Sequence, residues 1–164
     1  MKVCMIGTGY VGLVTGTCLA DLGQRVICVD NDKKKIEKVE NGISPFYEPG
    51  LKEKILKNRE SGRLTFNTSI NNVFNECDIF FIAVGTPPGE DGHADLSSVF
   101  AVADEVIASL KKNNRNDKIT IVTKSTVPVG TGKKLLKKIE DAQFENKIGV
   151  VSNPEFLREG SAIY

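Results

Sequence analysis

A glycine-rich turn between two strand-like segments constrains the fold of this chain most. The apolar run 2–6 leads directly into Gly7-Thr8-Gly9-Tyr10-Val11-Gly12, and a second run over 25–29 ends at Asp30. A GxGxxG string alone is weak because glycine is common, but here a strand precedes it, a helix follows it and an acid closes the next strand. This context predicts a dinucleotide-binding turn.

Each glycine of the turn has a physical task. Gly7 permits a sharp exit from the strand, Gly9 lacks the Cβ that would block a pyrophosphate, and Gly12 lets the helix pack closely on the sheet. The phosphates are expected at the N-terminus of that helix, where free N–H groups and the positive end of the helix dipole favour anions.

Asp30 is placed to accept hydrogen bonds from an adenosine ribose, and its charge would repel a 2′-phosphate. The sequence therefore favours NAD over NADP. Lys33, Lys34 and Lys35 weaken this preference because a nearby cation can accommodate a phosphate, although we expect at least two of them to be solvated in the next helix. A glycine-rich loop followed by an acid would also suit a protein that binds S-adenosylmethionine.

The composition is that of a single domain with a sizeable core, since 40% of the 164 residues are hydrophobic and 26% are charged. The net charge of +1 argues against a nucleic acid or a membrane surface as the main partner. No apolar stretch is long enough to span a bilayer and no signal peptide is recognised, so we expect a cytoplasmic protein.

The cysteines and the single histidine show no pattern of a metal site. Cys4, Cys18, Cys28 and Cys77 form no CxxC pair and no Cys/His ligand spacing, which predicts reduced core residues and no bound metal. His93 lies in a polar loop and is expected to be a surface residue more than a proton-transfer group.

Strand and helix signals alternate along the chain. This alternation predicts an α/β fold, a Rossmann-like doubly wound parallel sheet with helices on both faces. The expected elements after Asp30 are a helix to Glu40, a helix over 51–58, a strand over 64–67, a helical turn opened by Ser69, a strand over 79–84, a helix from Asp95 or Ser97 to Leu110, a strand over 118–123, a helix over 131–140 and a strand over 148–151.

Ligands of such sheets bind beyond the carboxyl ends of the strands. The distinctive loops 7–12, 85–89, 124–128 and 152–156 all follow predicted strands. Their polar residues Thr86, Ser125, Thr126 and Glu155 are therefore candidate site residues. Equally, Ser125 and Thr126 could cap the following helix, and Glu155 could be a solvated loop acid.

Five segments resemble the N-terminal part of the nucleotide-sugar 6-dehydrogenase family, most closely its UDP-glucose 6-dehydrogenases. They are GTGYVGLVTGTCLADLG, NGISPFYEPGL, FIAVGTPPGEDGHADLS, KSTVPVGT and VSNPEFLREGSAIY, and together they cover essentially the whole chain. The GDP-mannose and UDP-N-acetylmannosamine 6-dehydrogenases of the family, and a stand-alone NAD-binding module, remain alternatives.

The resemblance implies specific roles for motif residues. Gly7, Gly9, Tyr10, Val11 and Gly12 would bind the pyrophosphate of NAD. Asp30 and Lys35 would bind its adenosine side, and Gly85 and Thr86 its nicotinamide half, with Ser125, Thr126 and Glu155 also at the cofactor. Thr126 would orient an oxygen at the reacting carbon and Glu155 would act as general acid or base. Substrate would be contacted by Glu155, Phe156, Leu157, Arg158 and Glu159.

In the family, two NAD molecules convert a sugar C6 alcohol to a carboxylate through a cysteine-bound thiohemiacetal and thioester. The sequence ends at Tyr164, before the central helix, the nucleophilic cysteine and the UDP-binding C-terminal domain of the family. We therefore expect residues 1–164 to be an NAD-binding domain that binds NAD but requires the C-terminal half to bind UDP-sugar and turn it over. Full-length members are homo-oligomers.

Overall fold

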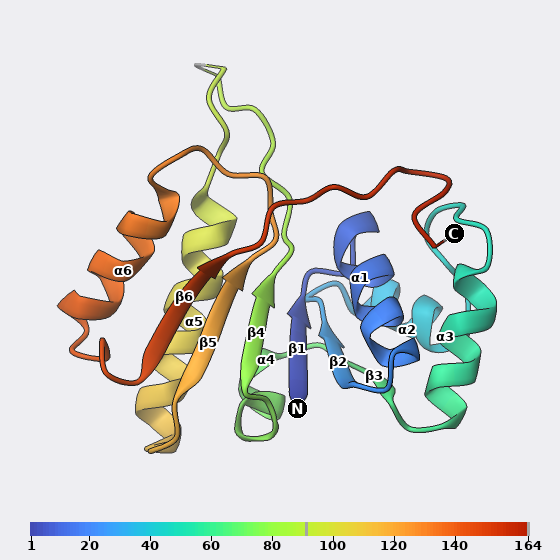
Figure 1. The fold of residues 1–164 in the computed structure, drawn as a ribbon, viewed down its shortest axis with the longest axis horizontal. Helices are drawn as coiled ribbons and strands as arrows, with labels where there is room; N and C mark the ends of the chain where they lie inside the picture. Colours follow the sequence, from blue (N-terminus) through green and yellow to red (C-terminus); the bar gives the residue numbers. More distant parts are fainter. Residues whose placement is uncertain (91, 164) are drawn as a thin grey trace.

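A parallel sheet with helices on both faces forms the body of the protein (Figure 1). The computed structural model describes residues 1–90 and 92–163, so Asp91 in one resemblance segment and Tyr164 at the expected domain end lie outside the described residues. The elements are β1 (Lys2–Ile6), α1 (Tyr10–Asp21), β2 (Arg25–Val29), α2 (Lys33–Glu40), α3 (Leu51–Glu60), β3 (Leu64–Asn67), α4 (Ile70–Val73), the 3₁₀ helix η1 (Phe74–Glu76), β4 (Ile79–Ile82), α5 (Ser97–Asn113), β5 (Ile119–Thr123), α6 (Thr131–Asp141) and β6 (Ile148–Ser152).

The six strands run parallel in the order β3-β2-β1-β4-β5-β6. In the centre, Val3 of β1 faces Val26 of β2 on one side and Ile79 of β4 on the other. The chain thus adds β2 and β3 on one side of β1 and then returns to add β4, β5 and β6 on the other side. The doubly wound sheet expected from the sequence is confirmed, and its switch point lies between β1 and β4.

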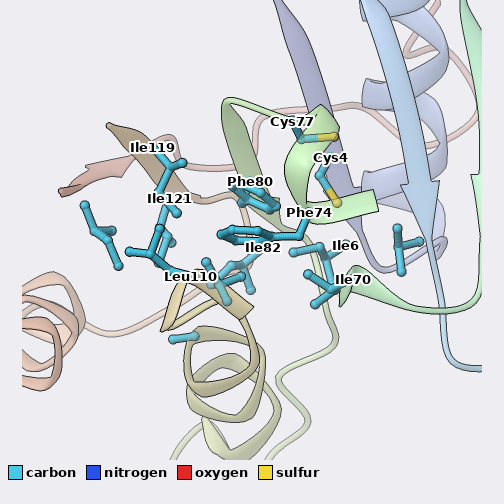
Figure 2. Packing of buried hydrophobic residues seen from close by; sticks show 14 of the residues in the cluster. Cys4, Ile6, Ile70, Phe74, Cys77, Phe80, Ile82, Leu110, Ile119 and Ile121 are labelled. Atoms are coloured by element: carbon cyan, nitrogen blue, oxygen red, sulfur yellow. The ribbon is translucent and has the colours of Figure 1, made fainter. Parts of the chain in front are cut away.

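Alternate residues of the strands enter two separate hydrophobic layers. Cys4 and Ile6 of β1 pack with residues of α4, α5 and α6, whereas Val3 and Met5 pack with residues of α1, α2 and α3. In the first layer the rings of Phe74 and Phe80 stack with 5.2 Å between their centroids. Figure 2 shows these two rings among the buried residues of the layer. Because helices cover both faces of β1, its residues 3–6 are all apolar.

Several element ends differ from those expected; helix α3, for example, ends at Glu60 and not at Asn58. The apolar run at 79–84 outlasts the strand, because β4 ends at Ile82 and Ala83 donates its N–H to the carbonyl oxygen of Ile6 (2.8 Å) as the chain leaves the sheet. Helix α5 continues past Leu110 to Asn113. The N-cap of α5 is Leu96, so the prediction of Asp95 or Ser97 as the cap is wrong, although Asp95 Oδ1 accepts from the Ser97 N–H at 2.8 Å just before the helix.

The C-terminal segment 153–163 crosses over the carboxyl ends of the strands and ends beside the connection between α2 and α3 (Figure 1). Leu157, Ala162 and Ile163 pack against the same hydrophobic layer as α1 and α3. The C-terminal segment 153–163 therefore contacts residues that follow β2 in the sequence.

Candidate functional site

The turn after β1 is formed as its glycines require. Gly7 adopts a φ of +98°, and a Cβ there would lie 2.6 Å from the carbonyl oxygen of Ala83. A Cβ on Gly12 would lie 1.9 Å from the carbonyl oxygen of Gly7. By contrast, nothing lies within 4 Å of a Cβ built on Gly9. Gly7 and Gly12 are thus needed for the turn to fold, whereas the space at Gly9 is free for a ligand.

Helix α1 begins directly after Gly9. Its first intrahelical hydrogen bond in this turn runs from the Leu13 N–H to the carbonyl oxygen of Gly9 (3.0 Å). The N–H groups of Tyr10 and Val11 precede that bond and belong to the first turn, whose donors have no partner within a helix. Open space beside free donors and a positive helix end suits a phosphate, so the turn fits the pyrophosphate of a dinucleotide.

Asp30 closes the adjacent strand and is tied to the turn. Its Oδ2 accepts from the Thr8 N–H (2.8 Å), the Thr8 hydroxyl (2.8 Å) and Lys35 Nζ (2.7 Å), while Oδ1 accepts from the Asp32 N–H (3.1 Å). Burial opposes ionisation, but the hydrogen bonds from Lys35 and Thr8 outweigh it and lower the pKa of the Asp30 carboxyl. Oδ1 has a further lone-pair direction available to a sugar hydroxyl.

A cleft of about 410 Å³ lies where these parts meet, at the switch point of the sheet. Five of the predicted cofactor residues line it, namely Gly7, Gly9, Asp30, Lys35 and Gly85. The others are not among its lining residues, namely Tyr10, Val11, Gly12, Thr86, Ser125, Thr126 and Glu155. The chain leaving the carboxyl ends of β1, β2 and β4 supplies the glycines and Asp30, because parallel strands end at one edge of the sheet, and Lys35 comes from the first turn of α2. The volume and the lining suit a ligand of nucleotide size.

One wall of the cleft was not predicted from the sequence. Ser98, Ala101, Val102 and Glu105 of α5 line it, together with Thr68. The α5 residues follow the spacing i, i+3, i+4 and i+7, which places them on one face of the helix. The small side chains of Ser98 and Ala101 on that face leave room for a ligand, and this helical spacing was the signal available in the sequence.

The predicted loop residues after β4 and β5 hold one another together. The Thr86 hydroxyl donates to the carbonyl oxygen of Thr126 at 2.8 Å. The buried Ser125 hydroxyl lies 2.7 Å from the carbonyl oxygen of Val84 and 3.2 Å from that of Ile82, and its single proton can serve one of them at a time. Thr126 itself is exposed beside these contacts. Ser125 therefore braces the loop, and Thr126 remains the residue available to a ligand.

Glu155 is paired with a lysine that was not singled out from the sequence. Lys124 Nζ lies 3.4 Å from Glu155 Oε2 and donates to the carbonyl oxygen of Pro154 at 3.2 Å. Glu155 Oε1 accepts from the Leu157 N–H. The side chains of Lys124 and Glu155 are 10% and 15% exposed, so this ion pair is largely removed from water. Glu155 is thus a held acid and not a freely solvated one.

The remaining predicted substrate residues lie on the segment after Glu155. Phe156 is 87% exposed, and Arg158 and Glu159 are exposed as well, whereas Leu157 is half-buried and packs on the core. Leu157 anchors this part of the chain and its neighbours face outward. The cleft lining itself includes none of 155–159 among the described residues.

The described residues also bear on metal sites, membrane-spanning helices and the state of the cysteines. Over residues 1–90 and 92–163, no group of three or more His, Cys, Asp or Glu side chains is arranged to hold a metal ion. No helix in the described part of the chain is long and apolar enough to cross a membrane. The cysteines are free, with Cys4, Cys28 and Cys77 buried and Cys18 half-buried, which confirms the prediction of reduced, mainly core residues.

A doubly wound parallel sheet with a glycine turn, a strand-end acid and a cleft at the switch point defines a dinucleotide-binding domain of the Rossmann type. The sequence profile of the UDP-glucose/GDP-mannose dehydrogenase family, NAD binding domain, matches residues 1–164. The chain belongs to this family, and NAD is the cofactor of its domain.

Individual relatives agree with this assignment. The UDP-glucose 6-dehydrogenase of Rhizobium meliloti is 49% identical over 164 residues, which are 99% of this chain and 36% of that protein. The Bacillus subtilis UDP-glucose 6-dehydrogenase TuaD is also 49% identical over 164 residues, covering 99% and 34%. The chain therefore spans about a third of the length of these relatives.

Solved structures share the fold over nearly the whole chain. A UDP-glucose dehydrogenase from the archaeon Pyrobaculum islandicum superposes with a TM-score of 0.90 at 40% identity, covering 99% of this chain and 37% of that one. A GDP-mannose dehydrogenase from Pseudomonas aeruginosa, solved as a ternary complex, gives a TM-score of 0.93 at 36% identity over 99% and 38%. Both support the same domain assignment.

Proposed function

We propose that this chain is the cofactor-binding part of a UDP-glucose 6-dehydrogenase, which oxidises the C6 alcohol of UDP-glucose to a carboxylate with two molecules of NAD. The observation that carries the cofactor half of the proposal is the cleft between β1 and β4, open at Gly9 and bounded by the Asp30 carboxylate. The sugar half is supported by relatives at 49% identity that are UDP-glucose 6-dehydrogenases and, among the solved structures, by 40% identity to a UDP-glucose dehydrogenase against 36% to the GDP-mannose dehydrogenase.

Some residues of the site bind the cofactor, and others take part in the chemistry. When bound, NAD accepts hydride from the sugar carbon. The first turn of α1 would hold the phosphates, Asp30 would accept a hydrogen bond from the adenosine ribose, and Gly85 and Thr86 would contact the nicotinamide half. Thr126 orients an oxygen at the reacting carbon with a neutral hydroxyl. Glu155 takes and returns a proton, and the Lys124 ion pair holds it in place meanwhile.

The chain by itself is proposed to bind NAD without turning over the sugar. A second oxidation needs a thiolate at the reacting carbon, and no cysteine lines the cleft among the described residues. Burial raises the pKa of Cys28 to about 12 and also raises that of Cys18. Cys28 and Cys18 are therefore poor nucleophiles at neutral pH. A hydrogen bond with Cys4 lowers the pKa of Cys77, but Cys77 precedes β4 and so lies at the edge of the sheet opposite the cleft.

Calorimetric titration of the chain with NAD, NADP and UDP-glucose tests the proposal. We expect NAD to bind, NADP to bind at least tenfold more weakly, and UDP-glucose to give no response. The variant Asp30→Ala should reduce the ratio of the NADP dissociation constant to the NAD dissociation constant. The variant Asp141→Ala removes an exposed acid far from the cleft and should leave this ratio unchanged. Absence of NAD binding, or steady NADH production from UDP-glucose by the pure chain, would contradict the proposal.

A further inference from the structure

One buried carboxylate joins the glycine turn to the C-terminal segment. Glu48, in the connection between α2 and α3, is 5% exposed. Its Oε2 accepts from the Tyr10 hydroxyl (2.6 Å) and the Gly160 N–H (2.8 Å), and its Oε1 accepts from the Ala162 N–H (2.8 Å). The backbone donors lie more than 110 residues further along the chain, so this contact exists only in the folded protein.

Tyr10 reaches Glu48 from the candidate cofactor site. It is the first residue of α1 and follows Gly9 directly, so its backbone lies where the phosphates are expected. Its ring contacts that of Phe46 at 5.0 Å between centroids, and its hydroxyl also lies 3.4 Å from the carbonyl oxygen of Arg158. The side chain of Tyr10 thus leads away from the cleft and into the C-terminal segment.

The C-terminal segment is held at both ends. At its start, Lys124 binds the carbonyl oxygen of Pro154 and pairs with Glu155. At its end, Glu48 accepts from Gly160 and Ala162. Between these two anchors Leu157 packs on the core and Phe156 is exposed, so the course of 156–159 above the strand ends depends on Leu157 and on where the two anchors lie.

We propose that Glu48 is a positioning residue that fixes the segment 155–162 above the candidate site and, through the Tyr10 hydroxyl, couples its order to the occupancy of the glycine turn. The assignment of 155–159 to substrate rests on the proposed function, whereas the anchoring itself does not. A ligand that fixes the first turn of α1 fixes Tyr10, and Tyr10 shares its acceptor with the Gly160 N–H. Linkage then requires that an ordered segment favour the ligand by the same factor.

A carboxylate suits this position because every group that faces it is a donor. An ionised carboxylate only accepts, and it can receive donors at both oxygens. A glutamine of the same shape would turn an NH₂ group towards either the Ala162 N–H or the pair formed by Tyr10 and Gly160. One set of buried donors would then lose its acceptor, and the end of the segment would detach.

Site-resolved amide hydrogen exchange of the chain, measured by NMR, tests the anchoring with Glu48→Gln. The matched control is Glu60→Gln, which changes an exposed glutamate of α3. We expect exchange at Gly160 and Ala162 to speed up at least tenfold in Glu48→Gln while exchange at Ile82 in β4 changes less than threefold. Unchanged exchange at Gly160 and Ala162 overturns the proposal, as does an equal acceleration at Ile82, which would show a general loss of stability.

The coupling is tested with NAD as the probe. In the native chain, saturating NAD should slow exchange at Gly160 and Ala162 at least threefold. In Tyr10→Phe, which keeps the ring and removes the hydroxyl, the same amides should exchange about threefold faster without NAD and gain no protection with it. Equal protection by NAD in both proteins overturns the coupling.

These experiments distinguish a failure of the proposed function from a failure of the proposed anchoring by Glu48. If NAD does not bind the native chain, the proposed function fails while the exchange comparison of Glu48→Gln still decides the anchoring. If Glu48→Gln does not fold, Tyr10→Phe alone decides it, because the loss of one donor to Glu48 must still accelerate exchange at Gly160 and Ala162. No acceleration in Tyr10→Phe then overturns the anchoring.

Discussion

Lys124 and Glu155 form a largely buried ion pair that joins the chain leaving β5 to the chain leaving β6. The Lys124 Nζ lies 3.4 Å from Glu155 Oε2, and the same ammonium donates to the carbonyl oxygen of Pro154. Lys124, which follows β5, thus holds the side chain of Glu155, the predicted general acid or base, in one position. Breaking such a pair is costly chiefly because the remaining charge stays buried without a partner.

The variant Lys124→Met is therefore expected to destabilise the chain by about 3 kcal/mol, since Glu155 would lose its cation. The control Lys137→Met removes an exposed partner of Asp141 and should cost less than about 0.5 kcal/mol. Urea unfolding of the three proteins, followed by circular dichroism, measures both differences. Equal losses in the two variants would show that the Lys124 pair behaves like a surface pair.

Two glycines of the turn should respond differently to alanine. In Gly9→Ala the new methyl meets no protein atom, so the free energy of unfolding should change by less than about 1 kcal/mol while NAD binding weakens at least tenfold. In Gly12→Ala the methyl would collide with the carbonyl oxygen of Gly7, and we expect a loss of about 3 kcal/mol or more. Thermal unfolding and NAD titration separate the two effects, and normal NAD affinity in Gly9→Ala would place the ligand elsewhere.

Filling the α5 wall of the cleft should block NAD without disturbing the fold. Ala101 is exposed and lines the cleft, so Ala101→Leu should weaken NAD binding at least tenfold while the melting temperature stays within about 3 °C. Ala108 is exposed on the same helix outside the cleft, and Ala108→Leu should leave NAD affinity unchanged. Equal affinity in the two variants would exclude the α5 face from the site.

The stability contributed by Asp30 should depend on pH in a defined direction. Its pKa in the folded chain is lowered below the ordinary value of 3.8, because its hydrogen bonds outweigh burial. The folded state then favours the ionised form, so this contribution is full above the unfolded-state pKa and is lost as the pH falls through the folded one. The difference in free energy of unfolding between the native chain and Asp30→Asn should therefore shrink from about pH 6 to about pH 3. A difference that is constant over this range would contradict the shift.

Much of the fold could be predicted because its signals are local. The run 79–84 is apolar throughout, and a strand buried on both faces needs no polar alternation. Its end could not be placed, since the same apolar residues Ala83 and Val84 go on to line the cleft after leaving the sheet. Helix α5 was expected from a cap at Asp95 or Ser97, whereas its N-cap is Leu96. That one face of α5 lines the cleft was not predicted, because the sequence does not show which elements lie opposite that face.

What the sequence alone determined was the class of the turn and the sheet that carries it. The positive φ of Gly7 and the close approach of Gly12 to the Gly7 carbonyl oxygen arise within the turn itself, and strand and helix periods are likewise set by neighbouring residues. The pairing of Glu155 with Lys124 and of Glu48 with Tyr10, Gly160 and Ala162 was decided only by the tertiary structure. These partners are far apart in the chain, and they meet because parallel strands end at one edge and the C-terminal segment crosses it.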